Sequence, residues 1–494
     1  MLYIGIDSGT QSTKSIVLDL ETGEVVAQAS QVHGLIPGLP AGHLEQHPSE
    51  WFDAVEATLA VCLDRLGDRR SEIRGIGVSG QQHGLVVLDA NDEVVRPAKL
   101  WCDTSTAEQC DRFSARFGGV KGLVEKTGNA VLPGYTVPKL LWLKQNEPDH
   151  FAKVASVLLP HDYINFRLTG VKRMEYGDAS GTGMLDVRTR QWDPDLIDFV
   201  DPRVREMLPE LGSSNEIHGT LRSDLAAKWG VKNDVIVSAG GGDNMMGAIG
   251  TGNIAPGIIT ASFGTSGTLY GCAEEPIVDP NGEIAAFCDS TDRWLPLACT
   301  MNVTVVTEQV RGWFGWDLAE LERQVASVPA GAEGVSFLPY LNGERTPNLP
   351  NGTGVVHGLG GSASSPAHLA RAAMEGATLG LAYGLRRFDE LGLTPGEIRL
   401  TGGGSKSGIW RAISADVFGV PVVGLATAEG AGLGGAIQAA HADGQGSYED
   451  LCGRLVVLDE SSRCEPNRDK VPLYREKLDK QIALTTTLRD AGLL

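Results

Sequence analysis

The sequence predicts an α/β protein with two similarly built halves. Apolar strands alternate with helical patterns, and several strands run directly into glycine-rich turns. The chain has 494 residues, more than the roughly 250–300 that one hydrophobic core serves, so at least two domains are expected. Its 63 glycines are about twice the usual share, which indicates many places where backbones approach closely.

The first half begins with the pattern of a strand, a polar turn and a hairpin, followed by a helix and another strand. In chain order these elements are expected at residues 2–6, 7–14, 15–20, 25–29, 48–66 and 73–78. Helical patterns then dominate to about residue 230. Further strands are expected at residues 235–238 and 258–261, each followed by a glycine-rich turn.

Two short motifs that each occur twice suggest that the halves are duplicates. The pattern Gly-Thr-x-x-Thr follows a strand at residues 9–13 and again at 264–268. Glu-Ile-Arg occurs at residues 72–74 and again at 397–399, in the same order relative to the first pattern. Each repeated motif is weak evidence alone, but together the two motifs favour two α/β halves, residues 1–245 and 246–494, that meet along a cleft.

The composition excludes several classes of protein. With 42 basic and 62 acidic residues, the net charge of -20 argues against binding nucleic acid or an anionic membrane surface. No apolar run approaches the ~18 residues of a membrane span, and the start of the chain does not resemble a signal peptide. None of the eight cysteines pairs as Cys-x-x-Cys, so we expect reduced thiols in a cytoplasmic protein. The sequence leaves a homodimer open.

Two strand-end turns with small polar residues are candidates for phosphate binding. Backbone N–H groups and hydroxyls in such turns are suited to a phosphate, and an aspartate at the strand end is suited to Mg²⁺. The residues concerned are Asp7, Gly9, Thr10 and Lys14 in the first turn, and Gly264 and Thr265 in the second. An ordinary polar hairpin turn is the alternative for the first turn alone.

A strand at the end of the second half leads into three glycines at 402–404 and then a helical stretch near Ser407. Bare backbone at a helix N-terminus can border a nucleobase or ribose, so Gly403, Gly404 and Ser407 are candidate nucleotide contacts. The alternative is a tight turn without a ligand.

Glycines 240–242 precede Asp243 and Asn244 directly after another strand. A carboxylate at such a strand end is a candidate general base, although an N-cap for the following helix is equally consistent with the pattern.

Gln82 and His83, in the loop Gly-Gln-Gln-His-Gly, offer donors and acceptors for a polyhydroxylated ligand. A structural histidine is the alternative. The chain contains no P-loop pattern. Its Gly-x-Gly-x-x-Gly matches at 75–80 and 430–435 are judged accidental, which leaves a nicotinamide enzyme poorly supported.

Longer motifs identify a family. Residues 134–146 match one signature, and residues 354–359 with 368–375 match a second. With the Gly-Gln-Gln-His-Gly loop and the stretch 338–347, these motifs resemble the FGGY carbohydrate kinases of the actin-like ATPase superfamily, and within them the xylulokinase group. The resemblance covers most of the chain, from Ile4 to about residue 440.

The resemblance implies two actin-like (ribonuclease H-like) ATPase domains flanking a central cleft, with sugar binding and catalysis in residues 1–245 and nucleotide binding in 246–494. It implies phosphorylation of D-xylulose by ATP to D-xylulose 5-phosphate. The implied roles are Asp243 as general base; Gln82, His83, Trp101 and Asn244 on the ketose; Asp7 on Mg²⁺; Gly9, Thr10, Lys14, Gly264 and Thr265 at the phosphates; and Gly403, Gly404 and Ser407 at the adenosine.

One residue departs from the pattern, and it bears on the substrate. Cys102 stands where xylulokinases usually have Asn. Another ketose or a polyol therefore stays open as the substrate, and a non-catalytic actin-like ATP-binding module is the remaining alternative. Residues 240–267 and 401–435 hold 19 of the 63 glycines, which we attribute largely to close approach of the nucleotide.

Overall fold

The computed structural model describes residues 1–427 and 430–494. These residues form two compact units, and each unit is discontinuous in sequence. The first unit contains residues 1–254, 273–295 and 430–456, and the second contains residues 255–272, 296–427 and 457–494.

The first unit is built on a mixed sheet with the strand order β13-β14-β5-β1-β2-β3, in which β15 also pairs with β5. Its strands are β1 (Leu2–Ser8), β2 (Ser12–Asp19), β3 (Val25–Val32), β5 (Ile73–Gly80), β13 (Ile217–Thr220), β14 (Ile236–Ser238) and β15 (Gly241–Gly242). The central strands β1, β5 and β14 are parallel, whereas β2, β3 and β13 are antiparallel to their neighbours. Since parallel strands end at one edge, the loops after β1, β5 and β15 meet there.

The second unit repeats this topology. Its sheet has the order β19-β17-β16-β22-β23-β24, with β16, β22 and β23 parallel and the outer strands antiparallel. The strands are β16 (Ile258–Phe263), β17 (Gly267–Gly271), β19 (Trp294–Thr300), β22 (Glu397–Thr401), β23 (Val422–Leu425) and β24 (Leu458–Cys464). Both Gly-Thr-x-x-Thr turns join the first two strands of their sheets, so the two copies of the motif occupy equivalent places in the two sheets.

Helices cover both sheets. In the first unit they are α1 (Pro48–Leu66), α2 (Ala107–Phe117), α3 (Gly119–Thr127), α4 (Thr136–Asn146), α5 (Pro148–Phe151), α6 (Pro160–Thr169), α7 (Tyr176–Ala179), α8 (Pro194–Val200), α9 (Val204–Met207), α10 (Ser223–Trp229), α11 (Asp243–Gly250), α16 (Gly430–Ala442) and α17 (Tyr448–Leu455). In the second unit they are α12 (Thr304–Phe314), α13 (Leu318–Ser327), α14 (Pro366–Glu390), α15 (Gly408–Phe418) and α18 (Val471–Asp490). None of the helices that the structure describes combines the length and apolar character needed to span a bilayer.

Short strand pairs interrupt the stretch that was predicted to be helical up to residue 230. They are β4 (Glu45–Gln46) with β7 (Ala98–Lys99), β6 (Val86–Leu88) with β8 (Ser156–Leu158), β9 (Arg173–Glu175) with β12 (Glu210–Gly212), and β10 (Leu185–Asp186) with β11 (Gln191–Trp192). Elsewhere lie β18 (Ala285–Cys288), β20 (Ser336–Pro339) and β21 (Gly354–His357). Strands this short show no apolar periodicity, so the prediction missed them.

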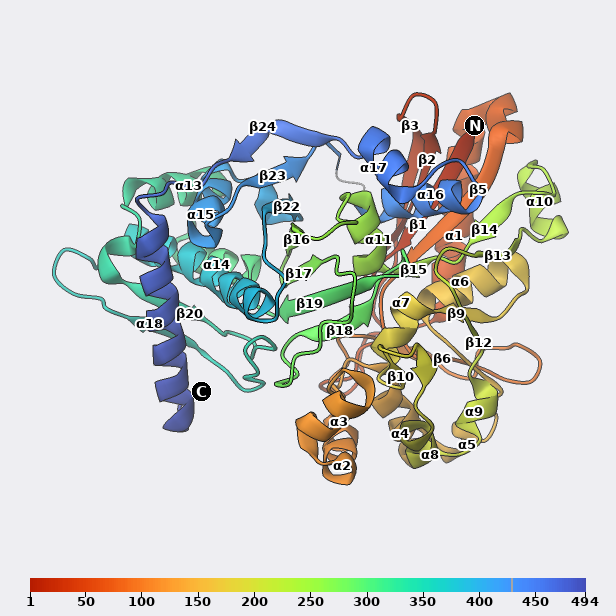
Figure 1. Cartoon of the computed structure of the whole chain (residues 1–494), viewed down its shortest axis with the longest axis horizontal. Coiled ribbons are helices and arrows are strands. Elements are labelled where there is room, and N and C mark those ends of the chain that lie inside the picture. Colours follow the sequence, from red (N-terminus) through yellow and green to blue (C-terminus); the bar gives the residue numbers. More distant parts are fainter. Residues whose placement is uncertain (428–429) are drawn as a thin grey trace. The chain divides into compact units, whose positions relative to one another are not determined.

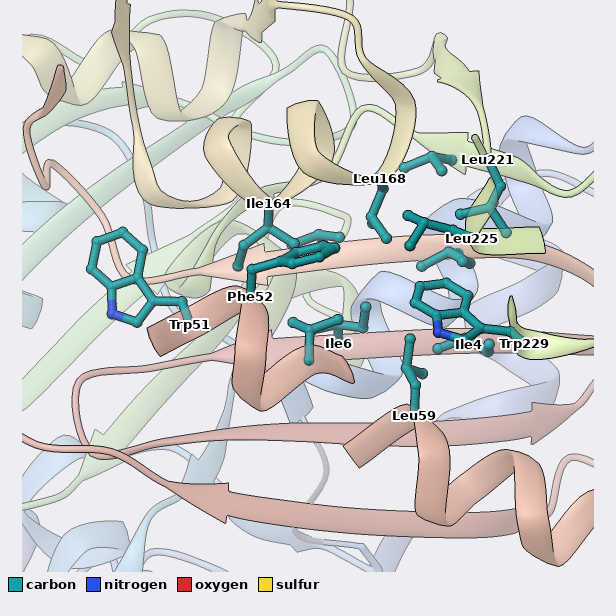
Figure 2. Close-up of a cluster of buried hydrophobic side chains, with 14 of the residues drawn as sticks. Ile4, Ile6, Trp51, Phe52, Leu59, Ile164, Leu168, Leu221, Leu225 and Trp229 are labelled. Carbon is teal, nitrogen blue, oxygen red and sulfur yellow. The ribbon is translucent and has the colours of Figure 1, made fainter. Parts of the chain in front are cut away.

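The core of the first unit lies between its sheet and helices α1, α6 and α10. Helix α1 begins with Pro48 at its first position, which suits a helix start, and buries Trp51, Phe52 and Leu59 on one face. These side chains meet apolar residues from β1 and from α6 and α10 (Figure 2). The packed core holds the strand ends in a fixed register, which fixes the loops that follow them.

Helix α16 packs on β1, β5 and α11 through glycines, although it begins 350 residues after the end of β5 (Figure 1). A Cβ at Gly5 would overlap the Gly432 carbonyl, and one at Gly77 would overlap the Gly435 carbonyl. This contact corrects the attribution of the 401–435 glycines largely to nucleotide binding. The glycines of α16 instead allow helix and strand backbones to touch.

Candidate active site

The edge where β1 and β5 end carries the first predicted residues. Asp7 is half-buried near the end of β1, and its Oδ1 accepts a 3.1 Å hydrogen bond from Ser79 Oγ on β5. Lys14 lies opposite Asp7 in the β1–β2 register, so both side chains lie on the same face of the sheet. The strand pairing thus places a carboxylate and a lysine side by side at this edge.

The turn between β1 and β2 is tied to neighbouring loops through Thr10. The Thr10 hydroxyl donates to Gln81 Oε1 at 3.1 Å and accepts from Trp101 Nε1 at 3.0 Å. Gln46 Nε2 donates to the Thr10 carbonyl at 2.7 Å, and the Gly9 N–H closes the turn onto the Ser12 carbonyl at 3.0 Å. These bonds hold Gly9, Thr10 and Trp101 close together.

Asp243 is the first residue of α11, and Gly242 occupies the N-cap position. The carboxylate Oδ1 accepts from the Asn244 N–H at 2.8 Å and from Asn244 Nδ2 at 3.0 Å. Burial, and after it the negative charges of Asp7 and Asp178, raises the pKa of Asp243 to about 7. The side chain therefore helps to order the start of the helix and is also poised to take up a proton near neutral pH.

Asn244 links this carboxylate to the loop after β5. Its Nδ2 donates to Gln82 Oε1 at 2.7 Å. A Cβ at Gly242 would lie 2.6 Å from Gln82 Cγ, so only glycine allows the Gln82 side chain to lie there. Gly240 has φ +74°, in the left-handed region that favours glycine. The glycine run is therefore explained by close packing of the two loops.

His83 is held in a strained, packed position. Its φ of +63° is uncommon for a non-glycine residue. Its carbonyl accepts hydrogen bonds from the buried Lys139 Nζ at 2.8 Å and from Thr136 Oγ1 at 3.1 Å. The ring lies 5.0 Å from Tyr135 and 5.4 Å from Phe287, centroid to centroid. Residues whose backbone is held in an unfavourable conformation in this way are characteristic of ligand sites.

A buried histidine and carboxylates lie directly behind these loops, and the sequence prediction missed them. His161, on α6, is completely buried, with Nδ1 3.0 Å from Asp178 Oδ2 and Nε2 3.0 Å from Asp162 Oδ1. Glu175 lies nearby, and burial raises its pKa to about 7. None of these residues belongs to a recognisable motif, and only the fold brings the 161–162 pair close to Glu175 and Asp178.

A separate cluster lies around Trp101 and Cys102. His43, Glu45 and Asp103 present ligand atoms within 4.8 Å of one another, in the manner of a metal site. The ammonium of Lys99 lies 3.1–3.2 Å from all three of these residues, so it already supplies the positive charge. The half-buried Cys102 packs against the apolar core of the first unit.

The remaining predicted residues lie at the corresponding edge of the second sheet. Ser262 pairs with Thr401 at the ends of the parallel strands β16 and β22, so the turns that follow leave from one edge. Thr265 is exposed in the β16–β17 turn with Gly264, and Gly403 is exposed after β22. Ser407 is the N-cap of α15, where its Oγ accepts from the Trp410 N–H at 3.3 Å.

Two of the three glycines at 402–404 have structural reasons of their own. Gly402 has φ +81°, and a Cβ there would lie 2.7 Å from the Phe263 backbone. Gly404 is buried against Phe263, Thr304 and Trp410. Gly403 faces open space, with nothing within 4 Å of an added Cβ.

The comparisons with known proteins agree over both units. Residues 2–250 match the N-terminal domain, and residues 259–442 the C-terminal domain, of the FGGY family of carbohydrate kinases. A xylulose kinase of Haemophilus influenzae is 44% identical over 487 residues, which cover 97% of this chain and 99% of the relative.

Solved structures show the same fold. A xyloylose kinase from Brucella ovis has a TM-score of 0.93 and 30% identity, covering 99% of this chain and 100% of its own. A xylulose kinase from Rhodospirillum rubrum has a TM-score of 0.91 and 28% identity, covering 99% of each chain. The α/β prediction and the predicted resemblance are confirmed. The chain therefore belongs to the FGGY family of carbohydrate kinases.

Proposed function

We propose that this protein transfers the γ-phosphoryl group of ATP to D-xylulose, giving D-xylulose 5-phosphate, with Asp243 as the general base. The observation that carries the proposal is the Asp243 carboxylate, which lies at the sheet edge with its pKa raised to about 7 and is oriented by Asn244. The 44% identical relative that is named a xylulose kinase supports the choice of sugar.

In this proposal the sugar is held beside the base by groups that the loops present. Gln82, His83, Asn244 and Trp101 supply amide, imidazole and indole groups suited to hydroxyls. Asp243 accepts the proton of the attacking hydroxyl, a step that general bases accelerate by about 10²–10⁴-fold. A pKa near 7 suits this role because about half of the carboxyl groups are ionised at neutral pH, and the ionised form is basic enough to take the proton.

Asp7 fits the proposed Mg²⁺. It offers a half-buried carboxylate at the sheet edge, and Mg²⁺ usually binds one or two carboxylates, waters and substrate phosphates. The ion would neutralise charge on the phosphates of ATP. Asp7, steadied by Ser79, is the only Mg²⁺ ligand that we propose.

The nucleotide contacts are proposed at both sheet edges. Gly9, Thr10 and Lys14 in the first unit and Gly264 and Thr265 in the second would face phosphates. Gly403, Gly404 and Ser407 would border the adenosine. The proposed division assigns sugar binding and catalysis to residues 1–245 and nucleotide binding to 246–494. A homodimer and a cytoplasmic location stay predictions.

The test is ADP release measured with D-xylulose, D-ribulose, L-ribulose, L-xylulose, glycerol and gluconate. We expect D-xylulose to give the highest kcat/KM, and we expect Asp243→Ala to lose sugar phosphorylation while it still binds ATP. Preference for another sugar or a polyol would correct the substrate. Absence of stimulation by every compound would support a non-catalytic ATP-binding module, and wild-type turnover in the variant would reject Asp243 as the base.

A further inference from the structure

Gln46 is a buried residue that the proposed function does not use, and its side chain reaches the β1–β2 turn proposed to face the phosphates. Its Nε2 donates to the Thr10 carbonyl in that turn at 2.7 Å. Its Oε1 accepts from Trp51 Nε1 and from Gln81 Nε2, each at 2.9 Å. Gln46 lies on β4, Gln81 directly follows β5, and both side chains are completely buried. Segments that are distant in the sequence therefore meet at one buried amide.

The direction of every hydrogen bond in this network is fixed, because some of its members can only donate or only accept. An indole N–H only donates, so Trp51 requires Oε1 of Gln46 on its side, and the Thr10 carbonyl requires Nε2 on the other. Gln81 must then direct its Nε2 at Gln46 and its Oε1 at the Thr10 hydroxyl, 3.1 Å away. A rotated Gln81 would set two amide oxygens against each other. Each amide therefore has one orientation.

The same network determines what the Thr10 hydroxyl can do. A hydroxyl has one proton to donate, and here that proton goes to Gln81 Oε1. The hydroxyl oxygen accepts from Trp101 Nε1 at 3.0 Å, and this indole N–H can again only donate. Because a phosphate oxygen needs a donor, the Thr10 hydroxyl has no proton left for it. Any contact between Thr10 and a phosphate therefore uses the backbone of the turn.

The main chain around Trp101 is tied to the strand that carries Gln46. That strand, β4, pairs with β7, which ends two residues before Trp101. The Leu100 N–H donates to the Leu44 carbonyl at 3.0 Å, and the Leu44 N–H donates to Asp103 Oδ2 at 2.9 Å. The main chain of Trp101 is thus fixed to β4, and its indole is fixed to the turn that Gln46 holds.

We propose that Gln46 and Gln81 are positioning residues that hold the β1–β2 turn, through Thr10, against the loops proposed to bind the sugar. Gln46 binds the Thr10 carbonyl and Gln81 the hydroxyl, which in turn binds the Trp101 indole. Gln81 also directly precedes Gln82 in the loop after β5. The inference rests on the proposed function, because it assumes that the turn and these loops bind phosphate and sugar. Neither Gln46 nor Gln81 is proposed to touch a substrate.

Thr10→Val tests which part of Thr10 matters. Valine keeps the shape of the side chain and removes the hydroxyl, which takes this partner away from Trp101 Nε1 and Gln81 Oε1. Losing such hydrogen bonds changes an equilibrium by about 10–100-fold, so we expect kcat/KM for the sugar to fall by that factor. The Kd for ATP should change by less than about twofold, because the hydroxyl donates to no phosphate. A Kd raised about tenfold would assign the hydroxyl to the nucleotide and overturn the inference.

Gln46→Met interrupts the network one step further from the substrates. Methionine keeps the length of the side chain and removes both the donor and the acceptor of the amide. We expect kcat/KM for the sugar to fall by about 10–100-fold here too. The double variant with Thr10→Val should resemble the single variants, because both changes act on one network. A kcat/KM equal to that of the wild type in Gln46→Met, or two losses that multiply in the double variant, would overturn the inference.

A matched control separates positioning from stability. Gln109, on α2, is also a buried glutamine of the first unit, and its Nε2 donates to another glutamine, Gln145, at 2.9 Å. Gln109→Met should lower the Tm without changing kcat/KM for the sugar. A fall in kcat/KM as large as that of Gln46→Met would trace the effect to lost stability and overturn the inference. A wild-type protein that is inactive on every sugar would instead reject the proposed function.

A measurement without substrate tests the network in either case. The indole ¹H–¹⁵N resonance of Trp101 in the full-length protein can be assigned with Trp101→Phe. This resonance should shift in Thr10→Val and in Gln46→Met and stay in place in Gln109→Met. A Trp101 resonance that is unchanged in Thr10→Val or in Gln46→Met would overturn the inference whatever the sugar proves to be.

Discussion

Replacing Asp243 by Asn should make the protein more stable and nearly inactive. Raising the pKa of Asp243 from its ordinary 3.8 to about 7 means that ionising it costs the folded protein about 4 kcal/mol. Asn cannot ionise, so the variant avoids this cost. Turnover should fall by about 10²–10⁴-fold, since the base that accepts the hydroxyl proton is lost.

The sign of the stability effect follows from the raised pKa. Below pH 4 the Asp243 carboxyl group is protonated in both the folded and the unfolded protein. Its ionisation therefore adds little to the difference in the free energy of unfolding between wild type and variant. Between pH 4 and 7 the unfolded state loses its proton first, which lowers the free energy of unfolding of the wild type. From pH 5 to pH 8 the advantage of the variant should therefore grow by about 2–3 kcal/mol.

Thermal unfolding measures this difference. At about 2.1 cal/mol/K per residue, the unfolding entropy of the chain is roughly 1 kcal/mol/K, so the gap in Tm should widen by about 2–3 °C between pH 5 and pH 8. The experiment is done with EDTA and without nucleotide. Asp111→Asn, at an exposed position on α2, serves as the control. The difference in Tm between this variant and the wild type should be the same at pH 5 and pH 8. A gap for Asp243→Asn that is constant or narrows with pH would refute the reasoning.

The remaining predictions concern three other residues. Gly181→Ala adds a Cβ that would overlap the His83 ring, so the sugar KM should rise at least about tenfold, whereas Gly312→Ala, which has open space, should leave it unchanged; equal KM values would contradict this. Lys139→Met removes a buried ammonium from the His83 carbonyl and should lower the free energy of unfolding in urea by about 2–4 kcal/mol; an unchanged midpoint would count against it. Burial raises the pKa of Glu344 to about 7, so stability is lost as pH rises from about 4.5 to 7. Glu344→Gln should therefore raise the Tm at pH 8 but not at pH 4, and a rise of the same size at both values would exclude this cause.

Much of the fold could be predicted because it depends on strong local patterns. The helix expected at residues 48–66 matches α1, where a proline opens a long amphipathic pattern. The strand expected at 73–78 matches β5 except for two residues at its end. The paired strands β4 with β7 and β6 with β8 were missed, because segments of two or three residues show no periodicity.

Some residues of the candidate site could be predicted from the sequence, and others could not. Gln82, His83, Asp243 and Asn244 were singled out because each follows a strand, and the parallel pairing of β5 with β15 brings their loops together. Their roles stay predictions. The buried charges behind them had no comparable signal, since a lone histidine at a helix start resembles an ordinary helical turn. Their partners depend on how α6 and α7 are packed, which no sequence spacing reveals.

The glycine contact between α16 and β1 also constrains how the chain can fold during synthesis. Residues 1–254 emerge from the ribosome long before α16, and until Gly432 and Gly435 arrive, the backbone of β1 and β5 lacks the helix that covers it. The first unit can therefore complete its core only when nearly the whole chain exists. A fragment ending near residue 250 would expose bare strand backbone and should aggregate, so this family member is best studied as an intact chain.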